Sequence, residues 1–266
     1  MPPRCQPGSC LGAAAIVLVT TIATTRAATL FDNGSLVTNP GAGAGGFDVS
    51  QASSDFNTQG FSVASPQRLA DDFTVTAPGW RVSGVTVNAY IAGTYPVPPV
   101  ASPFSALTLN LWRGGPPEQG AAELVATSTA LTGNAFSGIY RVANGAANFS
   151  STARPVFHLT ASFPDTELSP GNYWIDYSVT GSGGIVFSPM VMTGTPAAPL
   201  TRPGNAQRKL DPTGSWVTLF GGLSSQGLDF PFTVTGVAIP EPAAAAALLA
   251  AGILAIRRRA SQAARR

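Results

Sequence analysis

Five stretches of this chain carry apolar residues at every second position, and no helical period of useful length occurs between residues 30 and 236. In an extended strand successive side chains point to opposite faces, so this alternation predicts strands with one buried face each. Strands of this kind form antiparallel sheets that pack on one side. The alternating sets are Val85, Val87, Ala89 and Ile91; Leu107, Leu109 and Leu111; Phe157, Leu159, Ala161 and Phe163; Tyr173, Ile175, Tyr177 and Val179; and Leu228, Phe230, Phe232 and Val234.

Turn-forming residues separate these strands, as expected from a chain with 29 glycines and 23 prolines. With shorter candidates at residues 72–76, 139–142, 185–190 and 216–220, about nine strands are predicted. The fold expected for residues 29–236 is all-β: a single antiparallel two-sheet β-sandwich, jelly-roll-like in kind. Pro231 marks the last strand as an edge or as bulged, and residues 192–215 contain no clear strand.

The N-terminus has the layout of a secretory signal peptide over residues 1–28. Arg4 precedes a 13-residue apolar stretch, and Ala27 and Ala28 offer small residues for cleavage. The only two cysteines, Cys5 and Cys10, lie in the segment to be removed. The remaining body therefore contains neither a disulfide nor a thiolate metal ligand.

The C-terminus, residues 237–266, combines three devices in a fixed order. Pro240-Glu241-Pro242 cannot join a helix or a sheet ladder and so stays accessible. An apolar run at 243–256 follows, which should enter lipid as a helix, and then Arg257-Arg258-Arg259. The run would be about 21 Å long against a hydrocarbon core of about 30 Å, which favours a transient anchor over a permanent span.

This tail resembles the PEP-CTERM sorting signal of Gram-negative bacteria, on the strength of Pro240, Glu241, Pro242, the apolar run and Arg257 to Arg259. The resemblance implies transient insertion into the inner membrane and processing near Pro-Glu-Pro by an exosortase-type enzyme. It also implies an exported protein at the cell surface or outside the cell, of a kind often tied to extracellular polysaccharide. The segments 69–75, with 80–82 after them, and 168–175 resemble parts of exported β-sandwich proteins with such tails.

The formal charge of +2 is misleading, because seven of the fifteen basic residues lie in the two terminal segments. Residues 28–239 keep eight basic and twelve acidic residues. An acidic body with one lysine lacks the basic surface that nucleic-acid binding requires, so no nucleic-acid partner is expected.

No catalytic constellation is evident in the body. His158 is the only histidine, and its parity places it opposite Phe157 and Leu159, with Thr160 and Ser162. A hydrolytic triad needs a base held by a carboxylate next to a nucleophile, and no such motif is present. We interpret His158 as a solvated strand residue.

Acidic residues offer two further hypotheses. Asp71 and Asp72 are the only adjacent acidic pair, but on a strand they face opposite ways and do not form a glycosidase dyad by themselves. With Asp55 or Asp229 they are candidate Ca²⁺ ligands, although no recognised calcium loop surrounds them. The simpler interpretation is a polar start to a strand, with no cofactor.

Two tryptophans are candidate sugar-binding residues. Trp112 and Trp174 lie on the parity opposite their apolar neighbours, where ring faces could stack on sugars. Burial at a strand end or beneath a loop is the alternative, and the one we favour.

These observations predict a non-enzymatic, exported β-sandwich protein, sorted by its C-terminal signal and associated with exopolysaccharide. Two alternatives stay open. One is a secreted polysaccharide hydrolase whose carboxylates come from distant strands, and the other is a protein permanently tethered to the membrane by its C-terminal helix.

Overall fold

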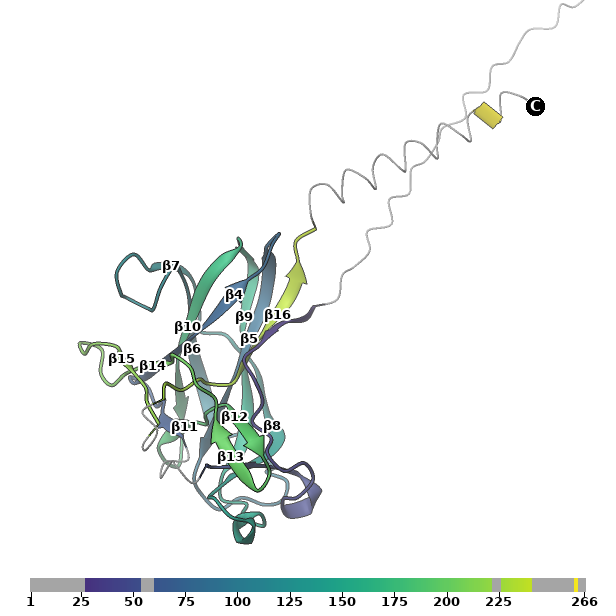
Figure 1. Cartoon of the computed structure of the whole chain (residues 1–266), viewed down its shortest axis with the longest axis vertical. Coiled ribbons are helices and arrows are strands. Elements are labelled where there is room, and N and C mark those ends of the chain that lie inside the picture. Colours follow the sequence, from purple (N-terminus) through teal and green to yellow (C-terminus); the bar gives the residue numbers. More distant parts are fainter. Residues whose placement is uncertain (1–26, 54–59, 222–225, 241–260, 263–266) are drawn as a thin grey trace, which may run out of the picture.

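The computed structural model describes residues 27–53, 60–221, 226–240 and 261–262, and this part of the chain is almost entirely β-structure (Figure 1). The all-β prediction is confirmed. The helical elements with described bounds are two short 3₁₀ turns, η1 (Ala44–Gly46) and η2 (Ala146–Asn148). The predicted signal peptide, apart from Ala27 and Ala28, and the apolar run at 243–256 fall outside the described residues. Within those residues, no helix has the length and hydrophobicity needed to cross a membrane.

The larger sheet has eight strands and runs in the order β1-β16-β5-β9-β8-β2, with β11 pairing to β5 and β3 to β11. Two of its long strands, β5 and β9, contain two of the predicted alternating sets. The strands are β1 (Ala28–Asp32), β2 (Asp48–Gln51), β3 (Phe61–Ser62), β5 (Trp80–Ile91), β8 (Leu131–Val142), β9 (Pro155–Leu168), β11 (Val186–Ser188) and β16 (Phe232–Ala238).

The second sheet has six strands in the order β15-β14-β4-β10-β6-β7, and a separate hairpin joins β12 to β13. Strand β10 lies at the centre of this sheet and carries another predicted set. The strands are β4 (Arg68–Val75), β6 (Phe104–Arg113), β7 (Glu123–Ser128), β10 (Gly171–Gly181), β12 (Met192–Thr195), β13 (Ala198–Thr201), β14 (Gln207–Lys209) and β15 (Val217–Thr218).

One hydrophobic cluster contains all five predicted alternating sets, and every member of them is buried. It unites side chains of both large sheets, such as Val87 and Leu159 from the eight-stranded sheet and Leu109 and Ile175 from the six-stranded one. At about 25 cal/mol per Å² of apolar surface removed from water, this burial is the main source of stability in a body without disulfides.

Three sequence expectations need correction. The sheets are not purely antiparallel, because β2 pairs with β8 in parallel. The region 192–215, expected to lack strands, contains β12, β13 and β14. Pro231 does not lie in an edge strand: β16 begins one residue later and runs between β1 and β5. A proline just before a strand removes no ladder hydrogen bond, so an interior position is allowed.

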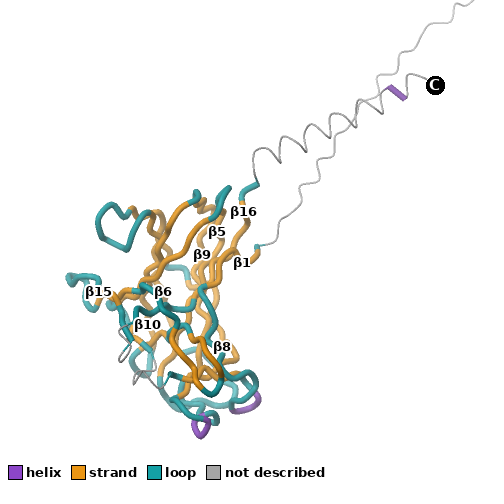
Figure 2. Tube along the Cα trace, viewed as in Figure 1, coloured by secondary structure: helices purple, strands orange, loops and turns teal. Residues whose placement is uncertain are grey.

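The first and last strands of the body lie side by side. Ala28 pairs with Gly236 in an antiparallel ladder, so the chain enters and leaves the body at the same end (Figure 2). The last described backbone bond to the body is from the N–H of Ile239 to the carbonyl of Gly79, at 2.9 Å. Pro240, one residue later, is exposed.

Candidate functional site

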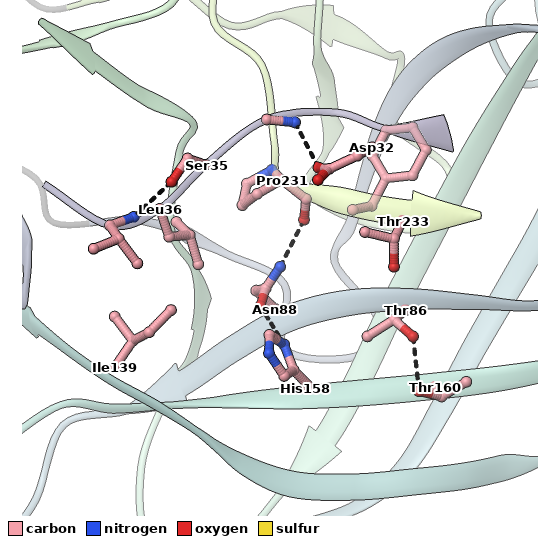
Figure 3. Close-up of a pocket in the computed structure, with 13 residues that line it drawn as sticks. Asp32, Ser35, Leu36, Thr86, Asn88, Ile139, His158, Thr160, Pro231 and Thr233 are labelled. Atoms are coloured by element: carbon pink, nitrogen blue, oxygen red, sulfur yellow. Dashed lines mark hydrogen bonds between the residues drawn. The ribbon is translucent and has the colours of Figure 1, made fainter. Parts of the chain in front are cut away.

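A cavity of about 460 Å³ opens on the face of the eight-stranded sheet that points away from the core (Figure 3). Its floor comes from β16, β5, β9 and β8, and its wall is the segment that follows β1. The lining residues are Asp32, Gly34, Ser35, Leu36, Val37, Thr86, Asn88, Ile139, His158, Thr160, Pro231, Phe232 and Thr233.

A chain of side-chain hydrogen bonds fixes His158 in this cavity. The Asn88 amide nitrogen donates to the carbonyl of Pro231 at 2.9 Å, so the Asn88 amide oxygen points at Nδ1 of His158, also 2.9 Å away. Because that oxygen only accepts, Nδ1 must carry the proton. The neutral ring then leaves Nε2 as an acceptor. His158 is an exposed strand residue, but the burial of part of its ring still lowers its pKa, which favours this neutral form.

Hydroxyl groups of serine and threonine and one carboxylate complete the polar lining. The hydroxyls of Thr86 and Thr160 are 2.8 Å apart across β5 and β9. Asp32 ends β1, and its Oδ1 accepts from the N–H of Gly34 at 2.9 Å. Leu36, Ile139 and Pro231 supply an apolar side to the same space. The arrangement suits a ligand with hydroxyl groups on one side and an apolar surface on the other.

The wall of the cavity is held in place by Asn33, which is buried. Its side-chain nitrogen donates to Asp71 Oδ2 at 2.9 Å and to the carbonyl of Phe230 at 2.8 Å. Its side-chain oxygen accepts from Arg202 at 2.7 Å, and Arg202 also pairs with Asp229. The wall therefore depends on a buried polar cluster that extends to the six-stranded sheet.

Asp71 and Asp72 face opposite sides of β4, as expected. Asp71 points inward with 0% of its surface exposed, and it accepts from Asn33, from the N–H of Phe230 at 2.6 Å and from the N–H of Asp72 at 2.9 Å. Burial first, and then the Asp229 carboxylate, raise the pKa of Asp71 well above its ordinary value. Asp71 thus anchors Asn33.

The calcium hypothesis finds little support in the geometry. Within the described residues, no group of three or more His, Cys, Asp or Glu side chains is placed to hold a metal ion. Asp55 lies outside the described residues, and the Asp229 carboxylate is engaged by Arg202. Calcium binding by Asp71 and Asp72 stays an untested prediction.

Trp112 and Trp174 lie opposite each other on β6 and β10, on the outer face of the six-stranded sheet. Trp174 is buried, with 6% of its surface exposed, and so offers no ring face to a sugar. Trp112 is half-buried, and its Nε1 donates to Asp176 Oδ2 at 2.5 Å. The indole of Trp112 is therefore part of a polar cluster.

Asp176 is the centre of this second cluster, and sequence reasoning missed it. Its side chain is fully buried, and it accepts from Arg68 Nε at 2.6 Å and from Asn110 at 3.1 Å as well as from Trp112. Burial raises the pKa of Asp176, and the charge of Arg68 opposes that shift. The signal was an acidic residue within an aromatic strand, on the parity of Trp174.

The loop between β6 and β7 reaches across this face. Glu118, with a φ of 58° that is uncommon outside glycine, pairs with Arg68 and with Lys209, a residue of β14. Gln119 donates to Gln207 at 2.6 Å. The loop thereby links β6 to β4 and β14, on the other side of β10.

Glu118→Gln is expected to lower the free energy of unfolding by an amount that depends on pH, because it removes the charge of this link. Burial acts to raise the pKa of Glu118, but Lys209 and Arg68 outweigh it, and the pKa lies below the ordinary 4.5. The stabilisation is thus present above pH 4.5 and is lost as the pH falls through the folded-state value. Since the carboxylate is partly exposed, we expect the variant to lose less than about 1 kcal/mol at neutral pH and nothing in strong acid.

Urea unfolding at neutral and acidic pH measures this difference, with Glu123→Gln on exposed β7 as the matched control. A Glu118→Gln loss that persists unchanged in acid would contradict the assignment.

No protein-family model matches the chain, and no curated protein matches it. The observations therefore define only a structural class: an all-β protein with a cavity, lined by both polar and apolar side chains, on the outer face of its larger sheet.

Proposed function

We propose that this chain is an exported cell-surface or extracellular-matrix protein with a non-enzymatic body. The C-terminal PEP-CTERM-like signal would deliver it, with transient insertion in the inner membrane and processing by an exosortase-type enzyme. The tail residues that support this route are Pro240, Glu241, Pro242 and Arg257 to Arg259, of which Pro240 alone is described. The body would then associate with extracellular polysaccharide.

The observation that carries the proposal is the position of the two ends of the body. Ala28, at the expected signal-peptide cleavage site, opens β1, and β16 ends at Ala238, two residues before the Pro-Glu-Pro motif. The core cluster draws all its residues from positions 30–234. Removal of both terminal segments would therefore cost the body none of its core.

We also propose that the two large sheets form a jelly-roll-like β-sandwich. Four antiparallel pairs are nested, the first strand with the last: β1 with β16, β4 with β10, β5 with β9, and β6 with β7. Successive pairs alternate between the two sheets. Nested pairing of this kind is what two Greek keys produce in a jelly roll, and the shared core cluster supports face-to-face packing.

The non-enzymatic body is supported by the partner of His158. A hydrolytic histidine is held by a carboxylate, whereas this one is held by the Asn88 amide. A glycosidase needs two carboxylates flanking the cleft, and the cavity has one, Asp32, among its described lining residues. The hydrolase thus has weaker support here than a binding protein. Permanent tethering by the C-terminal helix stays the other alternative.

Localisation tests the route. The full chain should fractionate with the cell surface or the medium, and a variant with Pro240, Glu241 and Pro242 all changed to alanine should accumulate at the inner membrane. Pro98→Ala and Pro99→Ala together, in an exposed connection of the body, form the control, which should be exported normally. Cytoplasmic full-length protein with both ends intact would refute the proposal.

A further inference from the structure

We propose that the cavity around His158 binds one neutral, polyhydroxylated ring, a single sugar unit, with a ligand hydroxyl donating to Nε2 of His158. The sugar class rests on the proposed association with polysaccharide, and the site itself rests on the geometry below.

The first argument is the fixed direction of the imidazole. Pro231 orients the Asn88 amide, and Asn88 in turn requires the proton of His158 to lie on Nδ1. Nε2 has no hydrogen-bond partner among the described contacts, yet the residue lines the cavity. A preset acceptor of this kind selects ligands that donate a proton, as a hydroxyl does.

The second argument is the composition of the surrounding surface. Thr86, Thr160 and Thr233 project from three adjacent strands toward the same space, and each hydroxyl can both donate and accept (Figure 3). Leu36 and Ile139 provide an apolar wall for the C–H face of a ring. Sugars combine these two kinds of surface, whereas a purely apolar ligand would leave Nε2 of His158 without a partner.

The third argument concerns charge and size. Asp32 is the one charged side chain among the described lining residues, so an anionic ligand would be repelled. The volume of about 460 Å³ lies near the lower end of the range for small-molecule sites. A single neutral ring is therefore favoured over a uronic acid.

The sole histidine makes the test direct, because ¹⁵N-histidine labelling of the full chain in detergent gives one imidazole. We expect Nδ1-protonated, neutral His158 at pH 7, and a shift of the Nε2 resonance on titration with methyl glycosides of glucose, galactose, mannose or N-acetylglucosamine. Glucuronate should shift it less. Affinities for a ligand this small should be millimolar.

Variants localise the site by calorimetry. His158→Gln should weaken binding of the best glycoside at least tenfold. Thr160→Val should also weaken it, and serves as the second test if His158→Gln fails to fold. Asp32→Asn should reduce the difference in affinity between that neutral glycoside and glucuronate. Ser162→Ala, on the same face of β9 but outside the lining, is the matched control and should bind normally.

Two results would overturn the inference: no Nε2 shift with any neutral glycoside up to about 100 mM, far above the expected Kd, or binding that survives His158→Gln and Thr160→Val. Either failure leaves the proposed export untouched if the protein still reaches the surface. Conversely, sugar binding by a protein retained in the cytoplasm would refute the export route alone.

Discussion

Asp71→Ala is expected to lower the free energy of unfolding by about 4 kcal/mol or more and to open the wall of the cavity. Three N–H groups would lose their acceptor: those of the Asn33 side chain, Phe230 and Asp72. Each buried donor left without a partner costs about 1–3 kcal/mol. Urea unfolding measures the loss, and the ¹⁵N resonances of His158 report whether the cavity is disturbed.

Asp71→Asn keeps the shape of this side chain but cannot titrate, so it tests the effect of the carboxyl proton alone. The pKa of Asp71 is raised above 3.8 in the folded protein, so the folded state binds more protons than the unfolded state in the window above that value. The stability of the unsubstituted protein should therefore fall as the pH rises from about 4 towards the folded-state pKa. Asp71→Asn should show a smaller decline, because Asp176, whose pKa is also raised, still contributes its own part. If Asp71→Ala costs less than about 1 kcal/mol, Asp71 does not anchor the wall.

Asp176→Ala should cost about 3–5 kcal/mol, the range expected when one member of a buried ion pair is removed. Arg68 would lose its fully buried partner, and the side chains of Asn110 and Trp112 would lose a shared acceptor. Urea unfolding with an unchanged m-value would identify a change in stability alone. The fluorescence of Trp112 should change as well, because its indole N–H donates to this carboxylate.

Asp176→Asn keeps the shape of the side chain and removes its charge. Its free energy of unfolding should therefore lie between that of the unsubstituted protein and that of Asp176→Ala. Glu123→Ala, on exposed β7, is the control and should change stability little. A loss equal in Asp176→Ala and Glu123→Ala would mean that the buried cluster contributes nothing.

The alternating core could be predicted from the sequence because the period of two is a local property. Val85, Val87 and Ala89 are buried as their spacing predicts. Strand β8 was missed over most of its length because its first half is largely exposed, so few apolar residues mark it. The parallel partner β2 was missed because pairing between distant segments leaves no local pattern.

The sites depend on contacts that span the chain, and this is why sequence reasoning reached them only in part. Parity placed His158 on the outer face, but its partner Asn88 is 70 positions away. Asn33 is 38 positions from Asp71 and 197 from Phe230. Residue types and spacing cannot reveal such partners. Only the register of β5 against β9, and the path of the chain after β1, bring them together.

The intact mass and terminal peptides of the protein recovered from the cell surface or the medium test the account most directly. We expect a chain that begins at Ala28 or Thr29 and ends near the Pro-Glu-Pro motif, without residues 243–266, because β1 and β16 leave the body complete between these points. An intact chain that keeps both terminal segments, and is found only inside the cell, would contradict it.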